Sequence, residues 1–174
     1  MIVDGVRLRL ASAQDAAVVA AVAQESFVAT FGADTYPPAD LAAFFADAMG
    51  PERYARAADD AQQWLELAED HGTVAGYALA GPSKQDVPAE ERAWELHQLY
   101  LASTLHGRGI ADAMLTRVVG EARARGAAAL YLSVWHGNHR AQRFYARHGF
   151  VEVGKLIYMV GSVEDDDRLW RLAL

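Results

Sequence analysis

The part of the sequence most informative about the fold is Glu95-Leu96-His97-Gln98-Leu99-Tyr100-Leu101, followed closely by His106-Gly107-Arg108-Gly109-Ile110-Ala111. The first segment is typical of a strand, and the residues after Gly109 have the apolar spacing of a helix that ends near Arg125. Gly107 and Gly109 lack a Cβ, so the backbone N–H groups of the loop can approach a ligand closely. The helix N-terminus adds further unpaired N–H groups and favours an anion. The segment therefore predicts a phosphate-binding loop.

Two common phosphate-binding loops do not fit this sequence. A P-loop ends in Gly-Lys-Ser/Thr, which is absent here. A dinucleotide-binding loop has Gly or Ala three residues after Gly109, where Asp112 stands, and an acidic residue about 20 positions further on. The predicted strand over 128–134 has no such acidic residue.

A third kind of loop fits, and it carries a resemblance to a known family. His106-x-x-Gly109-x-Ala111 resembles the Gln/Arg-x-x-Gly-x-Gly/Ala motif of the GNAT superfamily of acetyl-CoA-dependent N-acyltransferases, with His in the first place. Asn138-x-x-Ala141-x-x-Phe144-Tyr145-x-x-x-Gly149-Phe150 is similar to the family's later motif, at the expected distance. Within the family, bacterial spermidine/spermine N-acetyltransferases of the PaiA type have similar segments. These are Glu25-Ser26-Phe27, Thr30-Phe31, Val134-Trp135-x-x-Asn138 and Tyr158-Met159-x-Gly161.

The resemblance implies an α+β fold with a mixed, mostly antiparallel sheet of six to seven strands and four to five flanking helices. It also implies that the fourth and fifth strands splay apart. We expect one domain over residues 1–174, because the chain has no repeat or linker. Residues 81–92 predict a polar loop, and Asp165-Asp166-Asp167 predicts an exposed turn before a last strand over 168–174. The expected strands before it are 6–10, 62–68, 72–80, 94–101, 128–135 and 151–160, and Ser12 to Asp15 predicts a capping box.

The composition restricts the compartment and the chemistry. The chain contains no cysteine, which excludes disulfides, thiolate metal sites and a cysteine nucleophile. The sequence has no apolar run of membrane-spanning length and no N-terminal signal segment, so we expect a cytoplasmic protein without a membrane partner. A net charge of −7 argues against nucleic acid as the main partner.

The charge is distributed unevenly along the chain. Between His106 and His148 there are seven arginines against only Asp112 and Glu121, a local charge of +5, so the remainder carries −12. This predicts an anionic ligand on the basic segment and a cationic one elsewhere. Two solvated, arginine-rich helix faces are the alternative interpretation.

The resemblance implies acetyl-CoA as the cosubstrate and assigns residues to it. Main-chain groups of Leu99, Tyr100 and Leu101 are expected on pantetheine, and Asn138 matches a side-chain contact to the cofactor. Arg147 is a candidate for a cofactor phosphate, and no metal is expected. The loop amides expected on the diphosphate belong to Gly107, Arg108, Gly109, Ile110, Ala111 and Asp112.

Three side chains are candidates for the chemistry of acyl transfer. Tyr145 matches the family's tyrosine near the sulfur, which protonates the leaving thiolate; packing beside Phe144 is the structural alternative. Glu95 and His97 lie two positions apart on a strand and so project from one face. Either could deprotonate the amine if burial raises the pKa of Glu95, or both could be ordinary strand residues.

The predicted function is transfer of an acetyl group from acetyl-CoA to a primary amine, by direct attack in a ternary complex. Without cysteine, no acyl-cysteine route exists. The −12 outside the basic segment favours a polyamine or another small cation as acceptor. A protein N-terminus, an aminoglycoside, or a non-catalytic acyl-CoA-binding regulatory module are the alternatives. A homodimer is possible.

Overall fold

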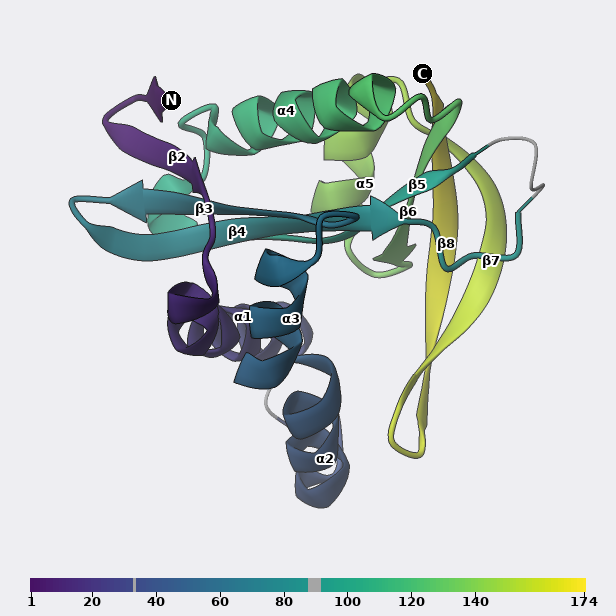
Figure 1. The fold of residues 1–174 in the computed structure, drawn as a ribbon. Coiled ribbons are helices and arrows are strands. Elements are labelled where there is room, and N and C mark those ends of the chain that lie inside the picture. Colours follow the sequence, from purple (N-terminus) through teal and green to yellow (C-terminus); the bar gives the residue numbers. More distant parts are fainter. Residues whose placement is uncertain (33, 88–91) are drawn as a thin grey trace.

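One mixed sheet of eight strands forms the centre of the molecule (Figure 1). The computed structural model describes residues 1–32, 34–87 and 92–174. The strand order is β1-β2-β3-β4-β5-β6-β8-β7; β5 and β6 are parallel, and all other neighbours are antiparallel. The strands are β1 (Ile2–Val3), β2 (Val6–Leu10), β3 (Trp64–Asp70), β4 (Thr73–Pro82), β5 (Trp94–Leu101), β6 (Ala129–Trp135), β7 (Val151–Val160) and β8 (Val163–Ala173).

The predicted fold is confirmed, with one short strand added at the N-terminus. β1 and β2 form a hairpin around Asp4 and Gly5, whose φ angles of 46° and 79° are both positive. Two consecutive positive φ angles are typical of the tight turn that joins two-residue hairpin loops. β4 includes the first two residues of the predicted loop over 81–92, and residues 88–91 of that loop lie outside the described part of the chain.

Helices cover both faces of the sheet and bury two separate cores (Figure 1). α4 (Ile110–Ala124) and α5 (His139–Arg147) lie on one face, and α1 (Ala16–Phe31) and α3 (Pro51–Asp59) lie on the other. α2 (Pro38–Ala48) projects away from the sheet and has no fully buried residue. No helix in the described ranges combines the length and the apolar character that crossing a bilayer requires.

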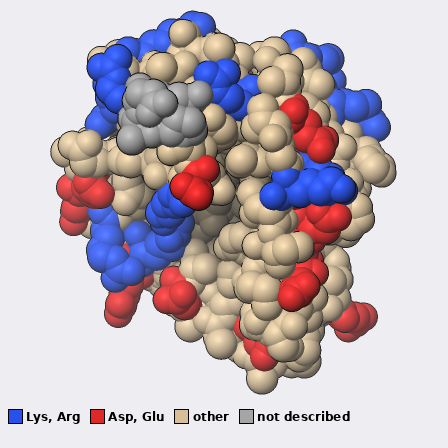
Figure 2. Space-filling model, turned by 90° about the vertical axis from the view of Figure 1, so that its right-hand side faces the viewer, with Lys and Arg blue, Asp and Glu red and all other residues tan. Residues whose placement is uncertain are grey.

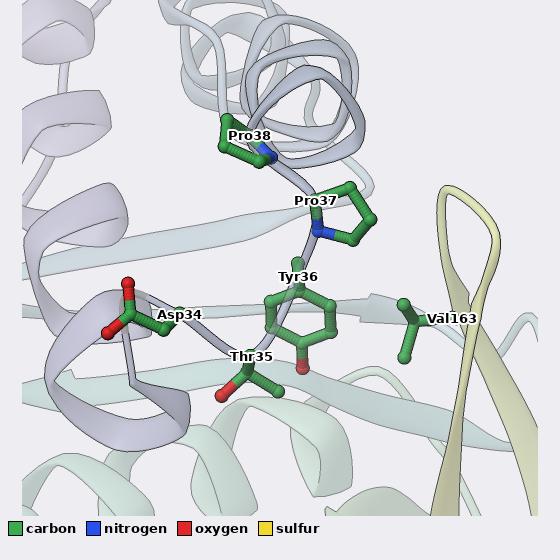
Figure 3. A pocket seen from close by; sticks show the side chains of 6 residues that line it. All are labelled: Asp34, Thr35, Tyr36, Pro37, Pro38 and Val163. Atoms are coloured by element: carbon green, nitrogen blue, oxygen red, sulfur yellow. The ribbon is translucent and has the colours of Figure 1, made fainter.

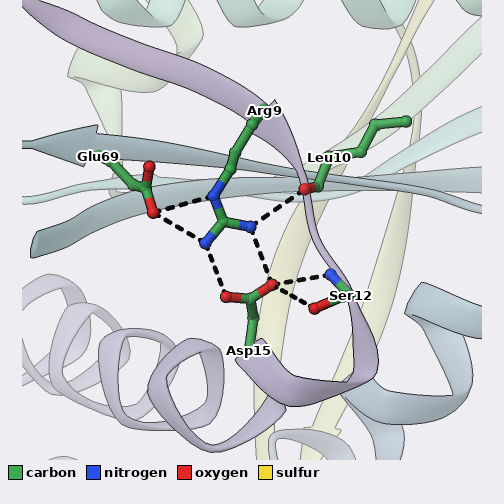
Figure 4. A network of polar contacts seen from close by, with 5 residues as sticks. All are labelled: Arg9, Leu10, Ser12, Asp15 and Glu69. Atoms are coloured by element: carbon green, nitrogen blue, oxygen red, sulfur yellow. Dashed lines mark hydrogen bonds and ion pairs between the residues drawn. The ribbon is translucent and has the colours of Figure 1, made fainter. Parts of the chain in front are cut away.

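The start of α1 is held by the predicted cap, with aspartate in place of the usual glutamate (Figure 4). Asp15 accepts hydrogen bonds from the Ser12 amide at 2.8 Å and from its hydroxyl at 2.9 Å. Arg9 on β2 binds both carboxylate oxygens of Asp15 and also Glu69 on β3. These hydrogen bonds, those from Arg9 first, hold the pKa of Asp15 well below its usual value. The cap therefore ties the first helix to two strands.

The sheet opens between β5 and β6, as the resemblance implied. Only two residue pairs join these strands, Trp94 with Leu130 and Glu95 with Tyr131. On the other side of β5, the β4 residues Leu79 and Ala80 pair with Gln98 and Leu96, so His97 is an extra residue in β5. Such a bulge bends its strand and re-aims side chains near it. The bulge and the early end of pairing together leave a gap in the sheet.

The acidic run near the C-terminus is strand, and the prediction of an exposed turn was wrong. β8 begins at Val163, so Asp165, Asp166 and Asp167 all lie within it and pair with β7. Asp165 and Asp167 are each only 8% exposed. Aspartate disfavours strands, but all three residues pair with β7, and Asp167 pairs with β6 as well, so this pairing overrides the local preference.

Candidate active site

A cleft of about 160 Å³ occupies the gap between β5 and β6. Its walls come from α1, α2, β5, β6, α5 and the β7–β8 hairpin. The chemically functional groups in the walls include side chains far apart in the sequence. They are His97, Gln98, Tyr100, Ser133, Asn138, Tyr145, Tyr158, Asp165 and Asp167.

The predicted phosphate loop presents its backbone as expected. Gly107 and Gly109 have φ angles of 76° and 73°, which favour glycine. The first hydrogen bond of α4 runs from the amide of Ala113 to the carbonyl of Gly109. The amides of residues 110–112 therefore precede the helical ladder. A Cβ added at Gly107 or Gly109 would meet nothing within 4 Å, so both glycines border open space.

His106 joins this loop to the rest of the site through a contact that sequence reasoning missed. Its Nε2 lies 3.1 Å from the carbonyl oxygen of Leu101, and its Nδ1 lies 2.9 Å from Nη1 of Arg140 on α5. Partial burial and the Arg140 charge lower the pKa of His106, so the neutral ring donates through Nε2 and accepts from Arg140 at Nδ1. Arg140, one helical turn from Phe144, thereby stands beside the loop. No local pattern distinguishes it from its exposed neighbours.

The other arginines of the basic segment mostly have partners of their own. Arg108 binds Asp4 at 2.7 Å and Asp70 at 3.3 Å, so its side chain is turned toward the N-terminal hairpin and only its amide remains for the loop. Arg117 on α4 pairs with the fully buried Glu66. These ion pairs reduce the positive charge available to a ligand. On the face shown in Figure 2, Lys and Arg lie along the top and at mid-height, interspersed with Asp and Glu, and the charged residues in the lowest part are Asp and Glu.

Arg147 does not lie in the cleft wall. It is exposed at the end of α5, and its guanidinium stacks on the ring of Phe144 with 5.8 Å between the charged carbon and the ring centre. On this helix, Arg140 contacts the loop directly, through His106. The geometry therefore supports a phosphate contact by Arg147 less than one by Arg140.

The end of β5 and the start of α5 bring the remaining predicted cofactor residues together. Leu99 and Tyr100 line the cleft, beyond the point where β5 pairs with β6; Leu101 accepts the hydrogen bond from His106. Asn138 also lines the cleft, and its Oδ1 caps α5 by accepting the Ala141 amide at 3.1 Å. The cap occupies the oxygen, which leaves the Nδ2 group of Asn138 as a donor toward a ligand.

Tyr145 is a buried phenol at the cleft wall. Its residue is 8% exposed, and its ring packs edge-on against Phe150 and Phe144. Burial raises the pKa of Tyr145, so its hydroxyl remains protonated near neutral pH. Tyr145 thus packs beside Phe144 and also lines the cleft, so it has both a structural position and access to a ligand.

Glu95 and His97 are in contact, but they have different surroundings. His97 Nδ1 lies 3.5 Å from Glu95 Oε1, and only His97 of the two lines the cleft. Burial favours the neutral form of Glu95, but its contact with His97 and hydrogen bonds from Lys84 and Gln85 outweigh burial and lower its pKa. The condition set for Glu95 as the base, a pKa raised by burial, is therefore not met, because the contact with His97 and the donors from the chain after β4 outweigh burial.

The cleft also contains two buried carboxylates that the sequence did not indicate. Asp165 accepts a hydrogen bond from the Tyr36 hydroxyl at 2.6 Å, and Asp167 is hydrogen-bonded to Ser133 on β6. Burial first, then the charges of Asp165 and Asp166, raise the pKa of Asp167 to about 6, despite opposing effects of Ser133 and His136. A carboxylate so perturbed inside a cleft is typical of functional sites.

A larger hollow lies outside the cleft, between the α1–α2 connection and the hairpin (Figure 3). Its volume is about 490 Å³, and its walls include Tyr36, Pro37, Pro38 and Val163. The Tyr36 hydroxyl is already committed to Asp165. Asp34 and Tyr36 are the titratable groups among the described residues that line this hollow, and Tyr36 is bound to Asp165, so we place the chemistry in the smaller cleft.

Comparison with known proteins identifies the family of this chain. The Acetyltransferase (GNAT) family matches residues 22–150. An uncharacterised N-acetyltransferase of Mycobacterium tuberculosis is 31% identical over 153 residues, which cover 88% of this chain and 94% of the relative. The chain belongs to the GNAT acetyltransferase family. As a GNAT protein it is placed among enzymes that acetylate amines with acetyl-CoA.

Solved GNAT structures share the fold along the whole chain. PaiA N-acetyltransferase from Thermoplasma acidophilum, solved with coenzyme A, superposes with a TM-score of 0.76 at 18% identity and covers 97% of this chain and 99% of its own. A putative GNAT acetyltransferase from Desulfovibrio desulfuricans is 26% identical, with a TM-score of 0.69 and coverage of 97% and 98%. At 18% identity, PaiA supports the fold and not a shared acceptor.

The residues of this GNAT chain fit acetyl-CoA. Open space lies where a side chain would stand on Gly107 and Gly109, and the amides of residues 110–112 precede the helical ladder beside it. Such a backbone cradle suits a diphosphate. The cleft between β5 and β6 continues from the same end of β5.

Proposed function

We propose that this chain transfers an acetyl group from acetyl-CoA to a primary amine of a small cationic acceptor, with a polyamine as the favoured class. One observation carries the proposal: a single cleft contains a protonated, buried Tyr145 and the bulge residue His97, next to a glycine cradle suited to a diphosphate. The three features come from different elements, and amine acetylation requires a proton acceptor, a proton donor and a bound thioester.

The proposed division of work follows from the surroundings of each side chain. Acetyl-CoA supplies the acetyl group as a thioester, held by the amides of residues 107–112, by main-chain groups of residues 99–101 and by Nδ2 of Asn138. His97 takes the proton of the ammonium at Nε2, because its Nδ1 faces Glu95. Glu95 is then a positioning residue, since it lies outside the cleft lining and is held by four groups.

Tyr145 is proposed as the proton donor to the leaving sulfur. Its phenol stays protonated in the free protein because burial raises its pKa. The amine nitrogen loses its second proton after attack, and that proton restores the phenol. The released products are the N-acetyl amine and the thiol, and no covalent enzyme intermediate is formed, in keeping with the absence of cysteine.

Thiol release from acetyl-CoA tests the proposal directly. The wild-type chain is incubated with spermidine, putrescine, an aminoglycoside and a peptide with a free N-terminus, and acetylated products are identified by mass spectrometry. We expect turnover with the polyamines above that with the other two. Coenzyme A binding without turnover on any amine would instead favour the regulatory module.

A further inference from the structure

The acidic run in β8 divides its three side chains between two environments. Asp165 and Asp167, two positions apart, share one face of the strand and line the cleft. Asp166 lies on the opposite face and pairs with Arg168 at 2.5 Å. Two of the three carboxylates thus point into the proposed acceptor side, and the third has its own cation.

The inward pair forms no ion pair within the described part of the chain; His136 acts on Asp167 electrostatically, but without a salt bridge. Among the described residues, no Lys, Arg or His forms an ion pair with Asp165 or Asp167, although both are more than nine-tenths buried. Their neighbours are hydroxyls and rings: Tyr36 on Asp165, Ser133 on Asp167, with Tyr100 and Tyr158 close enough to interact electrostatically. Burial of a carboxylate without a cation is costly. A bound cation would offset that cost.

The walls around the pair suit an alkylammonium chain. Aromatic rings from two helices and two strands meet there: Phe31 contacts Trp135 at 5.6 Å between ring centres, and Phe44 contacts Tyr158 at 6.1 Å. All four rings line the same cleft. Aromatic faces attract ammonium groups and cover methylene groups, so rings and carboxylates together select a chain that carries positive charge.

A metal ion is a poorer fit to this pair. Among the residues that the structure describes, no three or more His, Asp or Glu side chains are arranged to hold a metal ion. The pair is supplemented by hydroxyl and aromatic groups, and Tyr36 already occupies one oxygen of Asp165. Two carboxylates beside aromatic rings match an organic ammonium better than a compact divalent ion.

We propose that Asp165 and Asp167 form the ammonium-binding site for the amine acceptor, with Ser133 orienting Asp167 and the aromatic walls covering the carbon chain. The proposal rests on the proposed function and deepens it, because it names the residues that select a cationic acceptor. The two carboxylates act in recognition, so their loss raises the KM for the amine more than it lowers kcat.

The strand offers a matched control for the test. Asp165→Asn, Asp167→Asn and Asp166→Asn each remove one charge from consecutive positions, and only the first two face the cleft. Asparagine keeps the shape of aspartate, and an Asn at 165 can still accept from Tyr36. Each variant is titrated calorimetrically with spermidine at saturating coenzyme A, and its melting temperature and coenzyme A affinity are measured to confirm folding.

We expect Asp167→Asn and Asp165→Asn to weaken spermidine binding by about 10- to 100-fold, the size of a lost charged hydrogen bond. Asp166→Asn should bind spermidine like the wild type, and coenzyme A affinity should be unchanged in all three. Equal weakening in all three variants, unchanged binding in Asp167→Asn, or no spermidine binding by the wild type would each overturn the inference. If thiol release with another amine persists in those cases, the acetyltransferase function itself stands.

Discussion

The proposed cofactor end and the proposed acceptor end of the site are built differently. At the proposed cofactor end, the loop over 106–112 and the start of α4 present mainly backbone amides, and glycine supplies both the positive φ angles and the open space. At the proposed acceptor end, in the cleft, Asp165 and Asp167 meet Tyr36 and Ser133, which come from different elements. Backbone recognition leaves a local sequence pattern, whereas side-chain recognition depends on strand register and on which elements meet.

The largest expected effect breaks the cofactor end. Gly109→Val places a β-branched residue at a φ of 73° and fills the open space beside the loop amides. We expect the Kd of coenzyme A to rise about 1000-fold, because several hydrogen bonds to a charged diphosphate are lost together. Calorimetric titration with coenzyme A measures the change.

Gly120→Val is the matched control for that substitution. Gly120 also borders open space, but it lies within α4 at an ordinary helical conformation. The control should bind coenzyme A like the wild type, and circular dichroism should show both variants folded. Unchanged affinity in Gly109→Val would place the diphosphate elsewhere.

The next effect separates chemistry from binding at the middle of the cleft. Tyr145→Phe keeps the packing against Phe150 and removes only the hydroxyl. We expect kcat to fall about 100-fold, which is typical of losing a positioned acid, while coenzyme A affinity stays nearly constant. Steady-state kinetics with the best amine would measure it, and wild-type kcat in this variant would remove Tyr145 from the mechanism.

The ionised Asp167 at the proposed acceptor end should lower the free energy of unfolding of the protein. Asp167 has a folded pKa of about 6, above its unfolded value, so folding favours the protonated form and stability falls as pH rises from about 4 to about 6. Asp167→Asn removes this dependence and should raise the free energy of unfolding by about 1–3 kcal/mol above pH 6.

Urea unfolding at pH 4.0, 5.5 and 7.5 measures that difference. The gain of Asp167→Asn over the wild type should be smallest at pH 4.0, where Asp167 is protonated in the folded state and about half protonated in the unfolded state. A gain independent of pH, or a loss at pH 7.5, would show that Asp167 does not carry this cost.

The smallest effect concerns the tip of the hairpin that carries the pair. Gly161 has a φ of 59°, and a Cβ there would overlap the side chain of Asp40, which accepts two hydrogen bonds from Ser162. Gly161→Ala should cost about 1 kcal/mol of stability and raise the KM for spermidine a few-fold. An altered coenzyme A affinity, measured in the same preparation, would contradict the separation of the two ends.

The sequence predicted what local patterns encode. The glycine loop, the helix after it and the cap at Ser12 and Asp15 were anticipated from the residues themselves. Each depends on a residue type that a particular backbone conformation or contact favours. The family resemblance added the splay between the two central strands.

What escaped prediction depends on tertiary contacts. The inward direction of Asp165 and Asp167 follows from their register beside β7, and for Asp167 also beside β6, which no local pattern reports. Arg140 is distinguished from the other arginines of α5 only by its contact with His106, which the sequence does not show. The pKa of Glu95 is lowered, against the effect of burial, by its contact with His97 and by donors at Lys84 and Gln85, beyond the end of β4.

The most direct test of the account follows the backbone amides of the loop while coenzyme A is added. In ¹H–¹⁵N spectra of the labelled protein, we expect the amide signals of residues 107–112 to shift most, at a coenzyme A concentration that also saturates the calorimetric signal. Saturated binding with these amides unmoved would contradict the claim that this loop holds the diphosphate.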